Sequence, residues 1–343
     1  MHVVELTEPG VFEHRERDRP DPAADEVLVE VRHVGICGSD VHYYEHGRIG
    51  DYVVEDPLIL GHESAGEVVA VGDDVTGLDA GDEVALEPGI PCGECARCRS
   101  GEYNLCPDVE FMATPPDDGA FAEYVAWDAD FAHRLPEGVS TRAGALCEPL
   151  SVALHATRRA EIGLGDAALV TGAGPIGMLV SEAVRAAGAG SILVSDVVPE
   201  KLERAEAYGA TATVNPAEES LSAAVADFTD GEGVDAVIEA SGAPPAVAST
   251  VDVVRRGGTV LCIGLSAEDE IPIETNEIVD KELDFRGSFR FRNTYADAVS
   301  LLERGAVDVE KIIDFEMPMA DLTAAFERAR EPDVVKGMVT VRE

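Results

Sequence analysis

The chain has 343 residues, of which 45% are hydrophobic and 27% charged, and its formal net charge at pH 7 is −41. This length exceeds one typical core and the composition is globular, so we expect two folded domains rather than a disordered chain. A surface this acidic repels nucleic acid and anionic lipid, which argues against both as partners.

The large excess of acidic residues also predicts that the protein works at high salt concentration. Only four of the 26 basic residues are lysines, and so large a negative charge is tolerable where salt screens it, because the Debye length at molar salt is about 3 Å. We therefore expect a halophilic protein. The chain has no uninterrupted apolar run of roughly 18 residues and no secretory signal at its start, so we expect a cytoplasmic protein without a membrane span.

The expected elements change character along the chain. Short β-type runs at 27–31, 67–71 and 83–86 are separated by Gly and Pro turns. Strands at 168–171, 191–195, 234–240 and 259–263 then alternate with helices that begin at Pro175, Pro199 and Pro244. This alternation predicts a doubly wound parallel sheet over 151–288, inserted into a mainly-β domain that comprises 1–150 and 289–343. A last helix is expected from Thr294.

A glycine-rich motif connects the first of these strands to its helix. Gly172, Gly174 and Gly177 form G-x-G-x-x-G, and Asp196 ends the next expected strand. In this context the motif predicts a dinucleotide site, with the pyrophosphate at the helix N-terminus. A carboxylate at Asp196 accepts both ribose hydroxyls but repels a 2′-phosphate, which favours NAD over NADP. Lys201, one helical turn further on, is a candidate contact for the ribose or a phosphate.

Four cysteines crowd into a short glycine-containing lobe at about 88–108. Cys92, Cys95 and Cys98 follow a C-x-x-C-x-x-C spacing, and Cys106 comes seven residues later. Such a cluster in a cytoplasmic protein indicates a metal site rather than disulfides. A closed Cys₄ set predicts a structural Zn²⁺; an iron–sulfur cluster also uses four cysteines, but nothing else in the sequence indicates electron transfer.

A second zinc site is predicted nearer the N-terminus. Cys37 and His62 are suitable ligands that, with a carboxylate, leave one position open for an alcohol. Zinc there would lower the pKa of the alcohol and help to expel hydride toward nicotinamide. Ser39 is placed to take the alcohol proton, and His42 to pass it to solvent through the cofactor ribose.

These motifs together resemble the sorbitol and xylitol dehydrogenase branch of the zinc-containing medium-chain dehydrogenases. The resemblance covers almost the whole chain, and the stretches that carry it are 37–50, 61–63, 113–119, 148–152, 172–177 and 287–294. It implies a GroES-like catalytic domain, a Rossmann NAD-binding domain and a homotetramer, with a dimer as the alternative.

The resemblance also assigns the zinc ligands. It places them on Cys37, His62 and Glu63, with Glu148 near the metal, either touching its water or replacing Glu63 as the ligand. Cys147 stands near the place where ordinary alcohol dehydrogenases have a third zinc thiolate, so it is a competing ligand. With the Cys₄ lobe, the expectation is two zinc ions per chain, one catalytic and one structural.

Substrate and cofactor contacts follow from the same resemblance. The positions that contact the polyol in this branch are Tyr43, Glu148, Arg290 and Phe291, and Phe291 replaces a tyrosine common there. The cofactor contacts, besides the glycines, fall on Ile176, Asp196, Lys201, Ile263, Gly264, Leu265, Ser288, Phe289 and Arg290.

The sequence thus predicts reversible, zinc- and NAD-dependent oxidation of a polyol at C2 to the ketose. The alternative within the same class is a dehydrogenase of threonine or of another vicinal amino-alcohol or diol. The alternative from another class is an inactive NAD-binding structural or sensor protein. The presence of Cys37, Ser39, His42, His62 and Glu148 argues against that last alternative.

Overall fold

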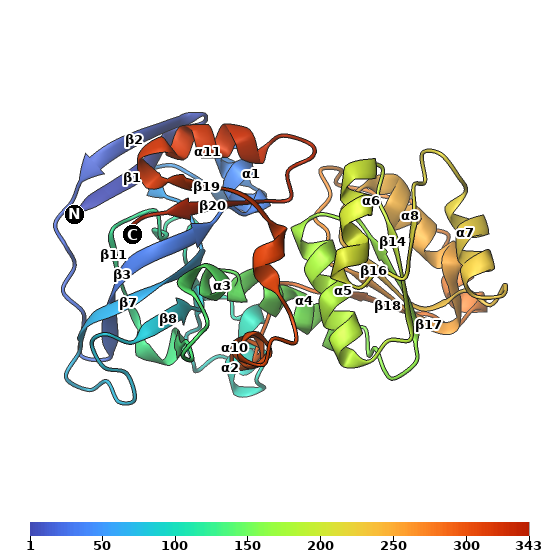
Figure 1. The fold of residues 1–343 in the computed structure, drawn as a ribbon, viewed down its shortest axis with the longest axis horizontal. Coiled ribbons are helices and arrows are strands. Elements are labelled where there is room, and N and C mark those ends of the chain that lie inside the picture. The colour runs from blue at the N-terminus through green and yellow to red at the C-terminus, as the bar shows by residue number, and fades with distance from the viewer. Residues whose placement is uncertain (343) are drawn as a thin grey trace. The chain divides into compact units, whose positions relative to one another are not determined.

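The chain forms two compact units in a computed structural model that describes residues 1–342. The mainly-β domain comprises Met1–Glu148 and Tyr295–Glu343, and the α/β domain comprises Pro149–Thr294 (Figure 1). Among the described residues, no helix is both long and apolar enough to cross a bilayer.

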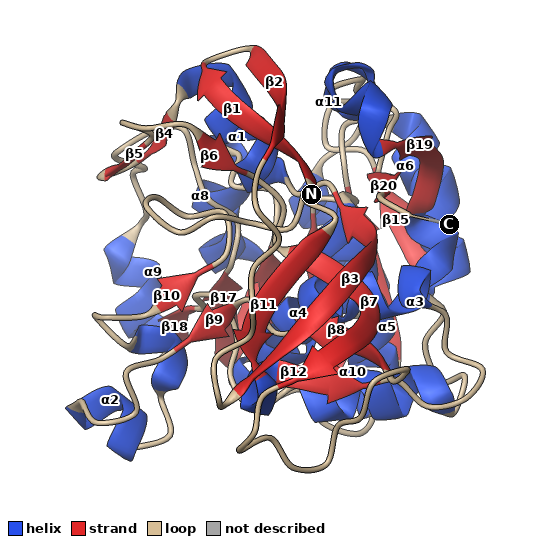
Figure 2. Cartoon of the chain, turned by 90° about the vertical axis from the view of Figure 1, so that its left-hand side faces the viewer, coloured by secondary structure: helices blue, strands red, loops and turns tan. Residues whose placement is uncertain are grey.

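The mainly-β domain is built on a seven-stranded sheet (Figure 2). Its strands follow the order β12 (Ala132–Arg134), β8 (Glu83–Leu86), β7 (Glu63–Val71), β3 (Glu26–Gly35), β20 (Lys336–Thr340) and β19 (Ile313–Pro318), and β11 (Tyr124–Asp128) also pairs with β3. Neighbours are antiparallel except β19 and β20, which are parallel. The longest ladder, between β3 and β7, positions the candidate site described below.

Smaller elements complete this domain. The further strands are β1 (His2–Glu8), β2 (Val11–Glu16), β4 (Arg48–Ile49), β5 (Tyr52–Val53), β6 (Leu58–Ile59), β9 (Gly89–Ile90) and β10 (Glu110–Phe111). The helices are α1 (Gly38–His46), α2 (Ala96–Arg99), α3 (Thr141–Ala145), α10 (Tyr295–Glu303) and α11 (Leu322–Ala329), and α4 (Cys147–Arg159) begins here. Phe326 of α11 contacts the rings of Phe12, Tyr44 and Phe121 at centroid distances of 4.8, 5.3 and 5.8 Å. This aromatic cluster, in which only Phe12 is partly exposed, holds α11 against the β-structure.

The α/β domain contains a six-stranded parallel sheet with helices on both faces (Figure 1). Its strand order is β15 (Ala212–Val214), β14 (Ser191–Ser195), β13 (Ala167–Thr171), β16 (Val234–Glu239), β17 (Val254–Cys262) and β18 (Asp284–Gly287). The helices are α5 (Pro175–Ala187), α6 (Pro199–Ala205), α7 (Leu221–Phe228), α8 (Pro244–Val253) and α9 (Thr275–Asp280). The order of the strands is 3-2-1-4-5-6, so the predicted doubly wound fold is confirmed.

Several elements differ in extent from the sequence-based expectation. The strand expected at 67–71 begins at Glu63, and the one expected at 27–31 runs from Glu26 to Gly35. Ser64 and Gly66 are weak strand formers, but pairing with β3 holds them in the ladder. The helix expected from Thr294 is present as α10.

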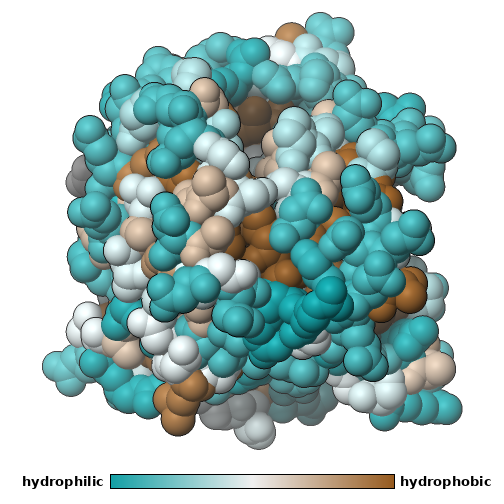
Figure 3. All heavy atoms as spheres, turned by 90° about the vertical axis from the view of Figure 1, so that its right-hand side faces the viewer, coloured by the Kyte–Doolittle hydropathy of each residue, from teal (hydrophilic) through white to brown (hydrophobic). Residues whose placement is uncertain are grey.

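One face of the surface combines many hydrophilic side chains with a few exposed apolar ones. Figure 3 shows a mainly hydrophilic face with hydrophobic side chains in separate places. Exposed aliphatic side chains of the α/β domain include those of Leu164, Leu265 and Val279. Scattered apolar side chains of this kind are ordinary on protein surfaces.

Candidate active site

Three of the predicted zinc ligands meet at one point in the mainly-β domain. Cys37 immediately precedes α1, His62 immediately precedes β7, and Glu63 is the first residue of β7. The β3–β7 ladder brings these segments together, because Gly35 at the end of β3 pairs with Glu63. One ligand atom from each of the three residues lies within 4.8 Å of the other two. The structure therefore assembles a Cys-His-Glu group of the kind that the sequence predicts.

Asp40 orients this group. Its buried carboxylate accepts hydrogen bonds of 3.1 Å from the backbone N–H groups of Cys37 and Gly61, and it lies 3.4 Å from Nδ1 of His62. Burial by itself lowers the pKa of His62, but Asp40 and then Cys37 outweigh it and raise that pKa well above its ordinary value. A carboxylate on the second ring nitrogen is the usual orienting partner of a metal-binding histidine.

Glu63 is held by a buried lysine. The ammonium of Lys336 donates to Glu63 Oε1 at 2.5 Å and to the carbonyl oxygen of Ile36 at 3.0 Å. The other carboxylate oxygen, Oε2, is buried and has no hydrogen-bond partner among residues 1–342. A β-carbon on Gly35 would lie 2.1 Å from this oxygen, so only glycine leaves room for it.

The donor set fits a zinc ion. A thiol, an imidazole and a carboxylate converge on one point, and the unpartnered oxygen of Glu63 leaves a buried polar atom that a cation would satisfy. Cys37, His62 and Glu63 are the residues that would hold the metal.

Glu148 and Cys147 lie outside this three-residue group. Glu148 is buried near the start of α4, and its pKa is raised to about 7, mainly by burial. The charges of Glu63 and Asp40 raise it further, while His62 and Lys336 act against the shift. Cys147 is fully buried, which raises the pKa of its thiol to about 12. Glu148 is thus in electrostatic reach of the cluster, whereas Cys147 is a buried neutral thiol.

Helix α1 carries the predicted proton route and one predicted substrate contact. Ser39 is half-buried and His42 is exposed, and their separation of three residues places them on the same helix face. The ring of His42 contacts that of His46 at a centroid distance of 4.6 Å. Tyr43 is buried beside them. The roles of these three residues stay predictions.

The glycine-rich motif adopts the geometry that a dinucleotide requires. Gly172 follows β13 with φ +94°, and Gly174 directly precedes α5. A β-carbon on Gly177 would lie 1.8 Å from the carbonyl oxygen of Gly172, so this contact tolerates only glycine. The carboxylate of Asp196, after β14, accepts hydrogen bonds from the N–H groups of Ala173 at 2.7 Å and Val198 at 2.9 Å. These bonds fix the acid beside the motif at the carboxyl end of the sheet.

The remaining predicted cofactor and substrate residues of this domain lie at the same end of the sheet or on its helices. Ile176 and Lys201 are half-buried on α5 and α6, while 263–265 follow β17 and 288–291 follow β18. The guanidinium of Arg290 lies 4.9 Å from the ring centre of Phe289, and Phe291 is buried. Their contacts with cofactor and substrate stay predictions.

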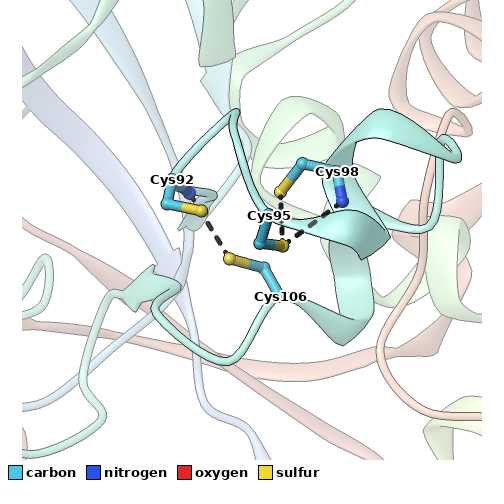
Figure 4. A group of neighbouring side chains, drawn as sticks. All are labelled: Cys92, Cys95, Cys98 and Cys106. Atoms are coloured by element: carbon cyan, nitrogen blue, oxygen red, sulfur yellow. Dashed lines mark hydrogen bonds between the residues drawn. The ribbon is translucent and has the colours of Figure 1, made fainter.

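The four-cysteine lobe forms a second candidate metal centre, shown in Figure 4. The thiol sulfurs of Cys92, Cys95, Cys98 and Cys106 all lie within 4.8 Å of one another, and none is in a disulfide. The backbone N–H of Cys98 donates to Cys95 Sγ at 3.4 Å, and this bond is the main cause that lowers the pKa of Cys95 to about 7. Four neighbouring thiols, one of which has a lowered pKa and so ionises more readily, fit a structural zinc site.

Sequence reasoning missed three residues that support these sites. Asp40 lies within the stretch 37–50 that carries the resemblance, but nothing in the sequence indicates that its carboxylate contacts His62. Lys336 is one of only four lysines, but its distance in sequence from Glu63 hid the pairing. Glu87 accepts a hydrogen bond from the hydroxyl of Tyr103 at 2.7 Å and lies 2.9 Å from the ring of His133, which connects the cysteine lobe to the sheet.

A mainly-β domain with a Cys-His-Glu group and a doubly wound domain with a dinucleotide motif together define a zinc-dependent dehydrogenase. Comparison with sequence families agrees: the alcohol dehydrogenase GroES-like domain matches residues 23–137, and the zinc-binding dehydrogenase family matches residues 175–304. The chain belongs to the zinc-binding medium-chain dehydrogenases. Zinc and a nicotinamide dinucleotide are the cofactors of this family: one solved relative is bound to NADP and another to NADH.

Individual relatives confirm the predicted resemblance to the sorbitol and xylitol branch. The chain is 45% identical to sorbitol dehydrogenase of Bacillus subtilis, over 90% of this chain and 88% of that one. It is 42% identical to D-xylulose reductase A of Aspergillus niger, over 96% and 94% of the two chains. Among solved structures, an Escherichia coli dehydrogenase of unknown specificity matches with a TM-score of 0.96 and 36% identity over 100% of this chain and 99% of that chain. The 2R,3R-butanediol dehydrogenase of Bacillus subtilis matches with a TM-score of 0.91 and 32% identity over 99% of both chains.

Proposed function

We propose that this chain is an NAD-dependent polyol dehydrogenase that reversibly oxidises a secondary alcohol at C2 to the ketose, with sorbitol or xylitol as the type of substrate. The observation that carries the proposal is the buried group of Cys37, His62 and Glu63, in a chain 45% identical to a sorbitol dehydrogenase. The likeness to a D-xylulose reductase supports the same polyol chemistry.

The residues around the group have distinct roles in this reaction. Zinc held by Cys37, His62 and Glu63 would act as a Lewis acid on the substrate hydroxyl, and NAD would accept the hydride. Ser39 would accept the hydroxyl proton, and the exposed His42 would pass it to solvent. Asp40 and Lys336 keep their partners His62 and Glu63 in one orientation throughout.

Glu148 suits a substrate with several hydroxyl groups. Its carboxyl group is buried, so its oxygens are shielded from water and can accept hydrogen bonds from substrate hydroxyl groups. A hydroxyl buried without a partner costs roughly 1–3 kcal/mol, so a polyol needs such groups where a simple alcohol does not. We assign Glu148 and Tyr43 to binding the polyol, and the resemblance to the polyol branch assigns the same role to Arg290 and Phe291.

We propose NAD rather than NADP as the coenzyme. The support is Asp196, whose carboxylate is fixed at the carboxyl end of β14 by two backbone N–H groups. A negative charge held in this position favours a ribose with free hydroxyls and disfavours a 2′-phosphate. Lys201 is assigned to the same ribose or a phosphate.

A second candidate substrate is a vicinal diol or amino-alcohol such as threonine. The observation that favours it is the likeness to 2R,3R-butanediol dehydrogenase, together with the loss of one hydroxyl where Phe291 stands in place of the branch's tyrosine. The inactive-scaffold alternative loses its support, because the chain belongs to a family of enzymes and both groups of metal-binding side chains are assembled.

One experiment separates these candidates. Purified enzyme at molar KCl is given sorbitol, xylitol, ribitol, 2,3-butanediol and threonine, each with NAD and with NADP, and reduction of the coenzyme is followed at its absorbance band. Reduction of NAD with a polyol supports the proposal. Failure with every polyol, or reduction with threonine or butanediol alone, would overturn it.

The cellular setting is also proposed. The net charge of −41 supports a halophilic enzyme of a salt-rich cytoplasm. The polyol-branch resemblance supports a homotetramer, which light scattering of the purified enzyme at molar KCl would test against a dimer. Two zinc ions per chain are proposed on the two groups of ligands, and metal analysis after dialysis would count them.

A further inference from the structure

A buried carboxylate lies at the centre of the cofactor end of the α/β sheet. Glu239 is the last residue of β16, it is fully buried, and it pairs in register with Thr171, the last residue of β13. The connections leave β13 and β16 in opposite directions along the sheet, since β14 lies on one side and β17 on the other. Dinucleotides bind outside the carboxyl ends of the strands at such a switch point.

The carboxylate is bonded to the loops around it. Its Oε1 accepts hydrogen bonds from Thr171 Oγ1 at 3.2 Å, from Ser241 N at 2.9 Å and Oγ at 2.5 Å, and from Gly242 N at 3.0 Å. The Glu239 carbonyl oxygen accepts from the N–H groups of Ile263 at 2.9 Å and Gly264 at 3.0 Å. One residue thereby connects the end of β13 with the loops that follow β16 and β17.

These loops touch so closely that glycine is required. A β-carbon on Gly264 would lie 2.3 Å from the nitrogen of Gly242 and 2.7 Å from Glu239 Oε2. A β-carbon on Gly242, whose φ is +66°, would lie 2.2 Å from the carbonyl oxygen of Leu265, and one on Gly172 would lie 3.0 Å from the side chain of Ser241. Such close packing leaves the loops little freedom once the carboxylate is in place.

We propose that Glu239 is a positioning residue for the nicotinamide half of the cofactor site. It fixes the loops after β16 and β17 relative to the glycine-rich motif. The doubly wound sheet has two mononucleotide-binding halves: β13, β14 and β15 form the half with Asp196, and β16, β17 and β18 form the other. Loss of the carboxylate loosens the second half while the first keeps its glycines and Asp196. This inference rests on the cofactor site proposed above.

The variant for the test is Glu239→Gln, which keeps the size of the side chain but puts an NH₂ group in place of an acceptor. Asp235→Asn is the matched control, because Asp235 lies near the other end of the same strand. There it accepts hydrogen bonds from the Ala167 N–H at 2.8 Å and the Arg255 Nε at 2.6 Å. Both carboxylates therefore connect β16 to its surroundings, but only Glu239 does so at the cofactor end.

Calorimetry measures the binding of NAD and of AMP to each zinc-loaded variant, since AMP occupies only the half that contains Asp196. We expect Glu239→Gln to lose about tenfold in NAD affinity and less than about twofold in AMP affinity. Asp235→Asn keeps both affinities within about twofold. Hydrogen exchange without cofactor is expected to be faster at the Ser241 and Gly242 amides, which donate to the carboxylate, in Glu239→Gln alone.

The inference is overturned if Glu239→Gln binds NAD with an affinity within about twofold of the parent's. It is also overturned if the variant loses affinity for NAD and for AMP by the same factor. If circular dichroism shows that Glu239→Gln does not fold, Ser241→Ala is judged by the same criteria, because it removes one of the four hydrogen bonds and keeps the charge. Failure of the parent enzyme itself to bind NAD refutes the proposed cofactor instead, so the two failures are distinguishable.

Discussion

Lys336→Met tests whether the ion pair behind the zinc ligands is needed. Lys336 and Glu63 have side chains only 2% and 1% exposed, and Nζ and Oε1 lie 2.5 Å apart. Burial by itself lowers the pKa of Lys336, but Glu63 outweighs it and raises that pKa, so the lysine is charged. Methionine fills a similar volume without the charge or the hydrogen bonds to Glu63 and Ile36.

Removing one partner of a buried pair leaves the other charge uncompensated, which costs about 3–5 kcal/mol. We expect a loss of this size in the free energy of unfolding of the zinc-depleted protein. The loss should be smaller with zinc bound, because the metal charge compensates Glu63. Lys311→Met is the matched control in the same domain: Lys311 lies 3.5 Å from Asp308, and both side chains are about half exposed. An exposed pair of this kind contributes at most about 1 kcal/mol.

The assay is urea unfolding followed by fluorescence of Trp127, the one tryptophan in the sequence, which is buried in β11 of the mainly-β domain. It therefore reports on the domain that contains the pair. Glu63→Gln added to Lys336→Met should recover part of the loss, because no buried charge is left alone. The reasoning is refuted if Lys336→Met costs no more than Lys311→Met, or if the double variant is as unstable as the sum of the two single ones.

Three further predictions concern zinc, coenzyme and pH, and a fourth concerns salt. Cys37→Ser should lower the zinc content from about two to about one per chain and abolish turnover, with an unchanged circular dichroism spectrum; retained turnover contradicts the ligand assignment. Asp196→Ala should weaken NAD binding far more than NADP binding in titrations, whereas equal losses contradict the ribose contact. Burial, and next the charge of Arg292, lowers the pKa of His155 from 6.5 to about 4. As the pH falls from about 6.5 to about 4, this histidine is protonated in the unfolded chain before it is protonated in the folded one, so the folded state loses stability. From pH 7.5 to pH 5 the free energy of unfolding of the parent should therefore fall by about 2 kcal/mol more than that of His155→Gln. Chemical unfolding at each pH measures both, and the same pH dependence in the two proteins would contradict the prediction. Thermal midpoints should rise steeply from low to molar KCl as the charge of −41 is screened, and a flat profile contradicts the halophilic proposal.

Parts of the structure were predictable because their geometry is set by neighbouring residues. The glycine-rich motif needs only a strand, a tight turn and a helix, and Gly172 to Gly177 supply all three within one short segment. The cysteine lobe is likewise local, with its four sulfurs brought together by turns between Cys92 and Cys106. Four of the six strands of the α/β domain were expected within a few residues, except that β17 begins earlier, at Val254; the edge strands β15 and β18 were not expected.

Other parts depended on contacts between distant segments. The start of β7 at Glu63 follows from pairing with β3, which overrides the weak strand preference of Ser64 and Gly66. The sequence left open whether Glu63 or Glu148 is the third zinc ligand; in the fold the side chain of Glu63 lies with those of Cys37 and His62, and which glutamate binds the metal stays a prediction. The sequence did not indicate the role of Glu239, because a glutamate at the end of an apolar strand does not by itself show which loops its side chain will contact.

The sequence by itself determined the class of the fold, the dinucleotide motif, the cysteine lobe and the acidic surface, since each is a property of composition or of short spacing. The tertiary structure alone decided which charged and polar side chains are buried together. Glu63 meets Lys336 across 273 residues of chain, and Thr171 meets Glu239 across 68. A buried charge is stable only beside its partner, and the fold of the whole domain, rather than any local pattern, brings that partner to it.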